Sequence, residues 1–478
     1  MEPEDADVAA ALQAARAAAK TWRETPLRRR LRIIRSARRR IGRDPEAIAA
    51  TLGDCRPLAD TLVAEVLPLV EAARFLERQA AAVLATRTLR RRFRPLWLWG
   101  VEAEIRREPL GVVLVLAPSN YPLFLPGAQI LQALAAGNAV CVKPAAGGAA
   151  PLRALAALLH EAGLPDGAFI VLDDSVATGA AASRAGFDRI VLTGSAATGR
   201  QVLAAAAATL TPCTMELSGC DAVYVLPGAD LDLVAGALAY GLRLNGGATC
   251  IAPRQAYLPA ALAGPLEQML QARIAGFPAH PVPAPVGALL DRLLDEAQAA
   301  GARVLARRTE AGVPPIVVAD APPSLPLLRT DIFAPVLALV PVADMEQALA
   351  IAQENPYALG ASIFGPPAAA MALAARVPAG SVVINDLIVP TADPRLPFGG
   401  RGRSGFGLTR GAEGLLEMTV VKTISTRRSG FTPHLDAARR GRAAPIAGLI
   451  RLLHGRRAWR FGSIAVATSQ LEGRPCQR

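Results

Sequence analysis

Residues 189–199 read RIVLTGSAATG, a short apolar stretch that runs into two glycines five positions apart. The apolar part, residues 189–193, predicts a strand that is buried on both faces. Gly194 and Gly199 flank a small polar loop, and a helical pattern begins near Arg200. Such a turn between a strand and a helix lets backbone N–H groups approach a phosphate. The stretch therefore predicts a strand–helix unit with a candidate phosphate site, and an ordinary tight turn is the alternative.

The flanking sequence repeats this alternation. Residues 111–117 (GVVLVLA) and 139–143 (AVCVK) are short and apolar, as expected of buried strands, and a helical pattern at 124–136 separates them. Alternating strands and helices predict crossover units and a parallel sheet, so the predicted fold class is α/β. The remaining predicted elements are helices within 6–90 and at 151–162 and 230–244, strands at 168–172, 303–306, 335–341 and 380–384, an extended segment at 95–106 and a glycine-rich loop at 396–411.

The composition indicates a large, basic protein with ample core. The chain has 478 residues, of which 52% are hydrophobic and 19% charged, which suits two packed domains. Its net charge of +12 favours anionic partners such as phosphates, nucleic acid or a membrane surface. The arginine run near 28–40 lacks interleaved aromatic residues, and neither it nor the run at 90–94 matches a nucleic-acid-binding module. We therefore expect solvated basic faces and no nucleic-acid partner.

The cysteines and histidines argue against disulfides and metal. Six cysteines are scattered without a C-x-x-C pair, as in a reducing compartment, which predicts a cytoplasmic location. The four histidines form no H-E-x-x-H motif or Cys/His ligand cluster, so no metal site is expected. Residues 1–5 lack a signal-peptide pattern, and no apolar run is long enough to span a bilayer.

Three residues have the chemistry of a catalytic site. Cys250 follows a Gly-Gly turn in LNGGATC, where a thiolate nucleophile would need a lowered pKa or a nearby base. Glu216 stands among apolar residues in TMELSG, and partial burial would raise its pKa toward that of a base. Asn120 in PSNYP follows a buried strand and can donate to an oxyanion. Each also has a structural alternative, and a cysteine–histidine hydrolase is a rival use of the thiol.

Eight stretches keep one order along the chain, and together they resemble the aldehyde dehydrogenase superfamily, within it the shorter, class 3-like branch. The resemblance covers about residues 100–425, and the N-terminal helices fit it more loosely. The stretches are APSNYP (117–122), AAGNAVCVKP (135–144), VLTGSAATG (191–199), LTPCTMELSG (210–219), NGGATC (245–250), DIFAPV (331–336), LPFGGRGRSGFG (396–407) and EGLLEMTVVKT (413–423).

The resemblance implies three structural parts. They are a Rossmann-type parallel-sheet cofactor domain, an α/β catalytic domain and a small β oligomerisation arm. The cofactor domain would comprise residues 1–94 and 112–216, the catalytic domain 217–405, the arm 95–111 and 406–430, and a basic tail 431–478. The arm implies a homodimer, although the sequence alone leaves dimer against tetramer open.

The resemblance also implies roles for single residues. Cys250 would attack the aldehyde carbon, while the Asn120 amide and the Cys250 backbone N–H hold the oxyanion. Hydride transfer to the nicotinamide would leave a thioester, and Glu216 would activate the water that hydrolyses it. Contacts to the dinucleotide are implied for Lys143 at the adenosine ribose, for Gly194, Ser195 and Gly199 at the pyrophosphate loop, and for Asp331 and Phe333 at the nicotinamide ribose and ring.

Several departures from the family pattern bear on the cofactor. Ala146 stands where the family often has a glutamate that accepts hydrogen bonds from the ribose and repels a 2′-phosphate, so NAD and NADP both stay open. Asp331 is one methylene shorter than the usual glutamate, so its carboxylate reaches less far toward the ribose. Ser119, Ala248 and residues 218–220 also differ, but none of these changes removes the nucleophile, the base or the oxyanion donor.

The sequence therefore predicts an NAD(P)-dependent enzyme that oxidises an apolar aldehyde, aliphatic or aromatic, to its acid. A CoA-acylating enzyme is disfavoured because relatives of that type lack the glutamate at position 216. A non-catalytic protein with a binding or structural role is the alternative from a different class. Residues 439–460 mix apolar residues with arginines, which predicts an amphipathic helix that lies on an anionic membrane surface or docks on the protein.

Overall fold

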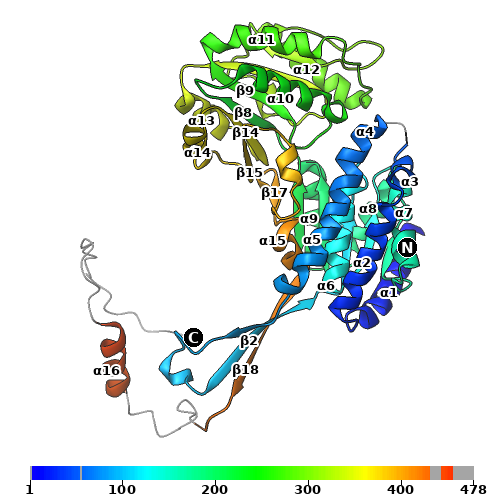
Figure 1. The fold of residues 1–478 in the computed structure, drawn as a ribbon, viewed down its shortest axis with the longest axis vertical. Coiled ribbons are helices and arrows are strands. Elements are labelled where there is room, and N and C mark those ends of the chain that lie inside the picture. The colour runs from blue at the N-terminus through cyan, green and yellow to red at the C-terminus, as the bar shows by residue number, and fades with distance from the viewer. Residues whose placement is uncertain (1–2, 54–55, 431–442, 456–478) are drawn as a thin grey trace, which may run out of the picture. The chain divides into compact units, whose positions relative to one another are not determined.

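The computed structural model describes residues 3–53, 56–430 and 443–455 of the 478 (Figure 1). The chain divides into two compact units, Met1–Arg87 with Ile105–Thr423 and Thr88–Glu104 with Ile424–Arg478. Both large sheets belong to the first unit. The boundaries that the sequence suggested for cofactor domain, catalytic domain, arm and tail stay a prediction.

The first large sheet has six strands. They are β3 (Val112–Leu116), β4 (Ala139–Lys143), β5 (Phe169–Val171), β6 (Arg189–Gly194), β7 (Cys213–Leu217) and β17 (Gly405–Phe406). Their order is β17-β7-β6-β3-β4-β5. All pairs from β7 to β5 are parallel, and β17 pairs with β7 antiparallel. The parallel sheet predicted from the alternation of strands and helices is confirmed.

Helices cover both faces of this sheet. They are α1 (Pro3–Trp22), α2 (Leu27–Ile41), α3 (Pro45–Ala50), α4 (Leu58–Thr61), the π-helical turn η1 (Leu62–Val66), α5 (Leu67–Val83), α6 (Phe124–Ala136), α7 (Ala149–Glu161), α8 (Val176–Arg184) and α9 (Ala196–Ala207). In β3, Val113 and Val115 pack in one apolar cluster with α2, α5, α6 and α7. Leu114 packs in the opposite cluster with α1, α8 and α9. Side chains that alternate between two covered faces explain why this strand is apolar throughout.

The helix ends follow local chemistry. Gly137 ends α6 with φ +101°, a left-handed cap that glycine adopts without strain, as the sequence suggested. Ser195 caps α9 because its side chain accepts a hydrogen bond from the Thr198 N–H, so this helix begins before Arg200. Asp230 caps the helix that starts at Leu231 in the same way, and this prediction is confirmed.

The second large sheet has seven strands. They are β8 (Asp221–Val225), β9 (Pro253–Pro259), β10 (Arg303–Val304), β11 (Ile316–Ala319), β12 (Val336–Val342), β14 (Gly360–Phe364) and β15 (Ser381–Ile384). Their order is β10-β11-β12-β9-β8-β14-β15, parallel apart from the antiparallel β10. The helices that accompany it are α10 (Leu231–Arg243), α11 (Ala260–Ile274), α12 (Ala284–Ala299), α13 (Met345–Gln353) and α14 (Pro367–Ala374). One face packs with α10 and α11, the other with α12, α13 and α14.

The short strand β17 brings a late part of the chain to the first sheet. Gly405 lies opposite Glu216 and Phe406 opposite Met215. A Cβ on Gly405 would lie 1.9 Å from the Met215 carbonyl oxygen, and its φ is +96°, so this close pairing requires glycine. The segment that follows, which leads into α15 (Gly411–Glu417), is thereby held beside Glu216.

The remaining elements are small. β13 (Tyr357–Ala358) pairs with β16 (Arg401–Gly402), and β1 (Arg87–Leu89), β2 (Val101–Pro109) and β18 (Thr419–Arg427) form a three-stranded sheet in that order (Figure 1). Leu96–Leu98 is a 3-10 turn, so the extended segment predicted at 95–106 is wrong there and is confirmed from Val101 onward, where β2 begins. Arg428 reinforces the second unit, since its backbone N–H donates to Gly100 and its side chain pairs with Glu102 at 3.0 Å.

The basic tail is described in part. Ala443–His454 forms a helix, α16, with Ile446 and Ile450 exposed. Residues 439–442 and 456–460 of the predicted amphipathic segment lie outside the described residues. Within the ranges that are described, no helix is both long and apolar enough to cross a bilayer.

Candidate active site

Cys250 follows a tight turn that the backbone can form only with glycine. In the 3-10 turn η3 (Leu244–Gly247), Asn245, Gly246 and Gly247 have φ of 53°, 58° and 73°. A Cβ on Gly247 would lie 2.7 Å from the backbone of Ala334. The turn thus packs against the segment before β12, and Cys250 follows it half-buried with a free thiol.

The buried side chain of Arg254 holds this turn through hydrogen bonds to backbone carbonyl oxygens. Its guanidinium donates to the carbonyl oxygens of Gly247 and Ala334, each at 2.7 Å, and the side chain is buried. Burial lowers the pKa of Arg254, and the charge of Asp331 opposes that effect. A planar, multi-donor cation bonded to two segments holds the loop before Cys250 more firmly than packing alone would.

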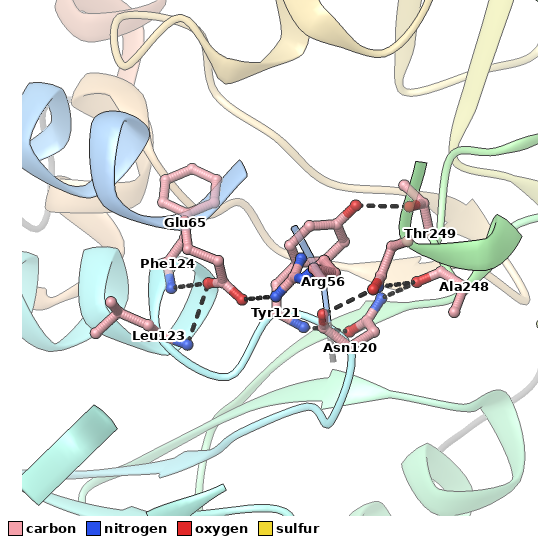
Figure 2. A network of polar contacts seen from close by, with 9 residues as sticks. Arg56, Glu65, Asn120, Tyr121, Leu123, Phe124, Ala248 and Thr249 are labelled. Carbon is pink, nitrogen blue, oxygen red and sulfur yellow. Dashed lines mark hydrogen bonds and ion pairs between the residues drawn. The ribbon is translucent and has the colours of Figure 1, made fainter. Parts of the chain in front are cut away.

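Asn120 lies against the same loop. Its side-chain amide donates to the carbonyl oxygen of Ala248 at 3.0 Å, and Asn245 donates to the carbonyl oxygen of Asn120 at 3.1 Å (Figure 2). The Tyr121 hydroxyl is 2.6 Å from that of Thr249. The Asn120 amide therefore contacts Ala248, which lies two residues before Cys250 in the chain. An oxyanion site beside Cys250 would require a donor in this region.

A buried ion pair that was not predicted from the sequence also supports the loop that carries Asn120. Glu65 accepts the backbone N–H groups of Leu123 and Phe124 and pairs with Arg56 at 2.6 Å (Figure 2). The Arg56 guanidinium lies 5.2 Å from the centroid of the Tyr121 ring. The carboxylate accepts two donors at the start of α6, which the helix itself leaves unpaired, and so fixes the loop that carries Asn120.

Glu216 is a buried carboxyl group with an unpartnered oxygen. Its Oε2 accepts from the Thr409 hydroxyl at 3.0 Å and from Gln129 at 3.4 Å. Oε1 is buried and accepts no hydrogen bond from the described residues. Burial raises the pKa of Glu216, and the charge of Arg410 opposes that rise. A carboxyl group with one free oxygen and a raised pKa suits proton abstraction from water.

Arg410 is a second buried charged group in this region that the sequence did not predict. It is buried, and its Nη1 donates to the Thr391 carbonyl oxygen at 2.6 Å. Its backbone has φ 59° and ψ 178°, a region that is almost restricted to glycine. Strain of this kind concentrates at functional sites. Nothing in the linear sequence separates this arginine from the rest of the 52 lysines and arginines.

Two pockets meet at the thiol. The apolar pocket has a volume of about 110 Å³, and apolar side chains dominate its wall, among them Phe124, Leu125, Leu244, Ile388 and Phe398. Its polar groups include Cys250, Glu216 and Arg410. The glycine-loop pocket, of about 330 Å³, is lined by Asn120, Thr193, Gly194, Ser195, Ser218, Asp331 and Phe333. Cys250 and Glu216 line both pockets.

The glycine-loop pocket has the features of a dinucleotide site. It lies where β6 ends and α9 begins, so the first N–H groups of that helix point toward it. Asp331 accepts a hydrogen bond from Ser218, while its other oxygen is buried without a hydrogen-bond partner among the described residues. Burial raises the pKa of Asp331, and the Ser218 hydroxyl opposes that rise. An unpartnered acceptor fits a ribose hydroxyl, and the helix terminus fits a pyrophosphate.

Two of the predicted cofactor residues lie apart from this pocket. Lys143, at the end of β4, has its side chain beside Gly179, and burial lowers its pKa while Asp174 and Asp173 oppose that shift. Gly199 faces Leu217, whose side chain would lie 2.9 Å from a Cβ at that position. Gly199 thus lets α9 pack closely on β7, a structural role beside the predicted one.

The sequence of this chain is similar to those of proteins of a known family. The model of the aldehyde dehydrogenase family matches residues 2–424. The chain is 31% identical over 434 residues to the 4,4′-diapolycopene aldehyde oxidase of Methylomonas sp, which covers 87% of this chain and 81% of that protein.

Solved structures agree with this. The aldehyde dehydrogenase of Mycobacterium tuberculosis complexed with NAD+ superposes with a TM-score of 0.82 at 28% identity, over 88% of this chain and 90% of that one. The NADP-dependent glyceraldehyde-3-phosphate dehydrogenase of Bacillus halodurans C-125, complexed with NADP, gives 0.81 at 26% identity, over 89% and 92%. The fold predicted from the sequence is confirmed; the class 3-like branch stays a prediction.

Proposed function

Because the chain belongs to the aldehyde dehydrogenase family, we propose that it oxidises an apolar aldehyde to its carboxylic acid with Cys250 as nucleophile. Its activity is that of an aldehyde dehydrogenase dependent on NAD or NADP. One observation carries the proposal for Cys250: its thiol lies where the apolar pocket meets the glycine-loop pocket. In an adduct on that sulfur, the rest of the aldehyde would extend into the apolar pocket, and the reacting carbon would face a cofactor in the glycine-loop pocket.

The first step is addition of the thiolate to the aldehyde carbon. The carbonyl oxygen then becomes an oxyanion, and the Asn120 amide together with the Cys250 backbone N–H would hold it. One hydrogen of that amide is bonded to Ala248, and the group carries a second that is free to donate. A nicotinamide held in the glycine-loop pocket would supply the hydride acceptor, and loss of that hydride from the adduct would leave a thioester on Cys250.

Glu216 is the proposed base for thioester hydrolysis. Its Oε1 has no described hydrogen-bond partner, and Thr409 and Gln129 orient the group through Oε2. The carboxylate would take a proton from water as the water oxygen attacks the thioester carbon. The bond between the carbon and the Cys250 sulfur then breaks, which releases the acid and leaves Cys250 as the thiolate. Glu216 lines the pockets on both sides of the thiol, so the attacking water would approach the Glu216 carboxylate from one of these two pockets.

The proposed cofactor contacts follow from the glycine-loop pocket. Gly194 and Ser195 would lie beside the pyrophosphate at the start of α9, with Gly199 allowing that helix to pack close. Asp331 would accept from the nicotinamide ribose through its free oxygen, and Phe333 would pack beside the ring. Lys143 would contact the adenosine ribose from the end of β4.

The substrate class follows from the other pocket. Its wall is mainly aliphatic and aromatic, so burying an alkyl chain or an aryl ring there would contribute the hydrophobic part of binding. We further propose a homodimer through the arm that contains β2 and β18, a cytoplasmic location, and surface contact of the basic tail with anionic lipid or with the protein itself.

The test is a panel of medium-chain and aromatic aldehydes, each with NAD and with NADP, followed by absorbance of the reduced cofactor. We expect turnover in the wild-type protein and none in Cys250→Ala. Cys213→Ala is the matched control, because that thiol is also partly buried yet lines neither pocket. Undiminished activity in Cys250→Ala would refute the proposed nucleophile.

A further inference from the structure

Arg410 places a fixed positive charge in the wall of the apolar pocket. The guanidinium carbon lies 4.3 Å from the centroid of the Phe398 ring and 5.7 Å from that of Phe124. Nη1 is bonded to the Thr391 carbonyl, and Nε is buried without a hydrogen-bond partner among the described residues. A guanidinium bordered by two rings and tied to a carbonyl has little freedom to move away.

The neighbouring residue links the same loop to Glu216. Thr409 donates its hydroxyl to Glu216 and exchanges two backbone hydrogen bonds with Phe398, at 2.7 and 2.8 Å. Gly411, which follows with φ +59°, has no room for a Cβ because the backbone at 395–397 lies about 3 Å away. The loop that carries Arg410 is therefore held at both ends of the arginine.

A positive charge near Cys250 would favour the thiolate form that acts as the nucleophile. Burial raises the pKa of Cys250, and the Glu216 carboxylate raises it further, because a second negative charge in a poorly hydrated pocket is unfavourable. Arg410 lowers it. The charged and titratable groups that face this thiol are Glu216, Asp221, Asp331, Arg254, Tyr121 and Arg410. Of the two cations among them, Arg254 is bonded to the carbonyl oxygens of Gly247 and Ala334 and lines neither pocket, whereas Arg410 lines the apolar pocket together with Cys250.

We propose that Arg410 is a positioning residue that acts through Cys250 and Glu216: its fixed guanidinium balances the Glu216 carboxylate and favours the thiolate form of Cys250. The inference rests on the proposed role of Cys250 as nucleophile. It explains why a buried, strained arginine stands in a pocket whose wall is mainly apolar. With the arginine present, base and nucleophile can carry negative charge side by side at the same pH.

The experiment measures how fast iodoacetamide alkylates Cys250 as a function of pH, quantified on the Cys250 peptide by mass spectrometry. The cofactor and the aldehyde are both absent, so the readout reports the thiolate fraction alone. In Arg410→Met, which keeps apolar bulk without charge, we expect the midpoint to move at least about one pH unit upward, with alkylation about tenfold slower below it. Arg410→Lys should keep most of the wild-type profile.

Glu216→Gln provides the test of opposite sign. Removing that carboxylate should move the midpoint downward, since the like charge beside the thiol is gone. Arg410→Gly serves if the methionine variant fails to fold, because glycine relieves the strained backbone while removing the charge.

Three results separate the outcomes. Unchanged midpoints in folded Arg410→Met or Arg410→Gly overturn the inference while leaving Cys250 as nucleophile. An unchanged profile together with a raised KM only for aldehydes that carry a carboxylate would mean that Arg410 recognises substrate, which also overturns it. Retained turnover in Cys250→Ala would instead remove the proposed function on which the inference rests.

Discussion

The apolar pocket and the glycine-loop pocket share a wall but are built on different principles. In the apolar pocket, selectivity would come from aliphatic and aromatic surface with a fixed buried charge, Arg410. In the glycine-loop pocket, the binding groups are backbone N–H groups at the start of α9 and oxygens such as the free one of Asp331. Altering the first is costly in free energy because its charges are poorly hydrated, whereas the second depends largely on backbone N–H groups that a side-chain substitution leaves in place.

This contrast teaches where substitutions should have large effects. Changes to buried groups that both pockets share should affect chemistry strongly, and changes to the turn that carries the thiol should affect stability and chemistry together. Changes at the far end of the cofactor site should alter selectivity by modest factors, because solvent screens those charges.

The largest effect is expected from Glu216→Gln, at the shared wall. Glutamine keeps the shape and can still bond Thr409, but it cannot take a proton from water. We expect a retained first-turnover burst of reduced cofactor and a steady-state rate lower by about 10² to 10³. Stopped-flow absorbance separates the burst from turnover, and full steady-state activity in this variant would refute the base assignment.

The pH profile sharpens the same prediction. Burial raises the pKa of Glu216 above its ordinary value of 4.5. The base works only when ionised, so turnover should fall as the pH drops through this raised pKa, at a pH above 4.5. Glu216→Gln should lack that acid limb in its residual rate. If both proteins show the same limb, another group produces it.

An intermediate effect is expected from Gly247→Ala, in the turn before Cys250. The new methyl would lie 2.7 Å from the Ala334 backbone, at φ +73°. Overpacking with an unfavourable φ should lower the free energy of unfolding by about 2 kcal/mol or more and slow Cys250 alkylation. The control is Gly276→Ala, which has φ +83° and no neighbour within 4 Å, so denaturant titration of both separates the clash from the φ penalty.

The smallest effect is expected at the far end of the cofactor site. Lys143 interacts electrostatically with Asp174 and Asp173, whose carboxylates would repel a 2′-phosphate near that lysine. The double variant Asp173→Asn with Asp174→Asn should bind 2′-phospho-ADP-ribose several-fold tighter, with ADP-ribose little changed. Calorimetry measures both, with the double variant Asp166→Asn and Glu310→Gln, which removes the same two charges elsewhere on the surface, as the control for net charge. Equal gains in the control would remove the specific role.

The sequence predicted those parts of the site that depend on neighbours in the chain. The helix at 124–136 with its glycine cap and the strands around 112–116 and 139–143 follow from local periodicity and turn chemistry. Cys250 came from a motif of contiguous residues, and the structure places it at the junction of the pockets.

The parts that the sequence could not predict depend on distant contacts. Arg410 and Thr409 lie in the segment that was predicted only as a glycine-rich loop, 396–411. The pairing of β17 with β7 brings this segment beside Glu216, where Thr409 donates a hydrogen bond to the carboxylate. The ion pair of Arg56 with Glu65 supports Asn120 from residues that only tertiary packing brings near. No periodicity or spacing in one sequence encodes such neighbours.

The pairing of β17 with β7 also bears on how the enzyme is made. Glu216 and its partner Thr409 stand 193 positions apart, so a nascent chain exposes the thiol of residue 250 long before the base beside it is oriented. Contacts of such long range close late in folding. The proposed catalytic centre is therefore complete only after residue 409 has been synthesised, and a product truncated before that residue would retain Cys250 without the loop that orients Glu216.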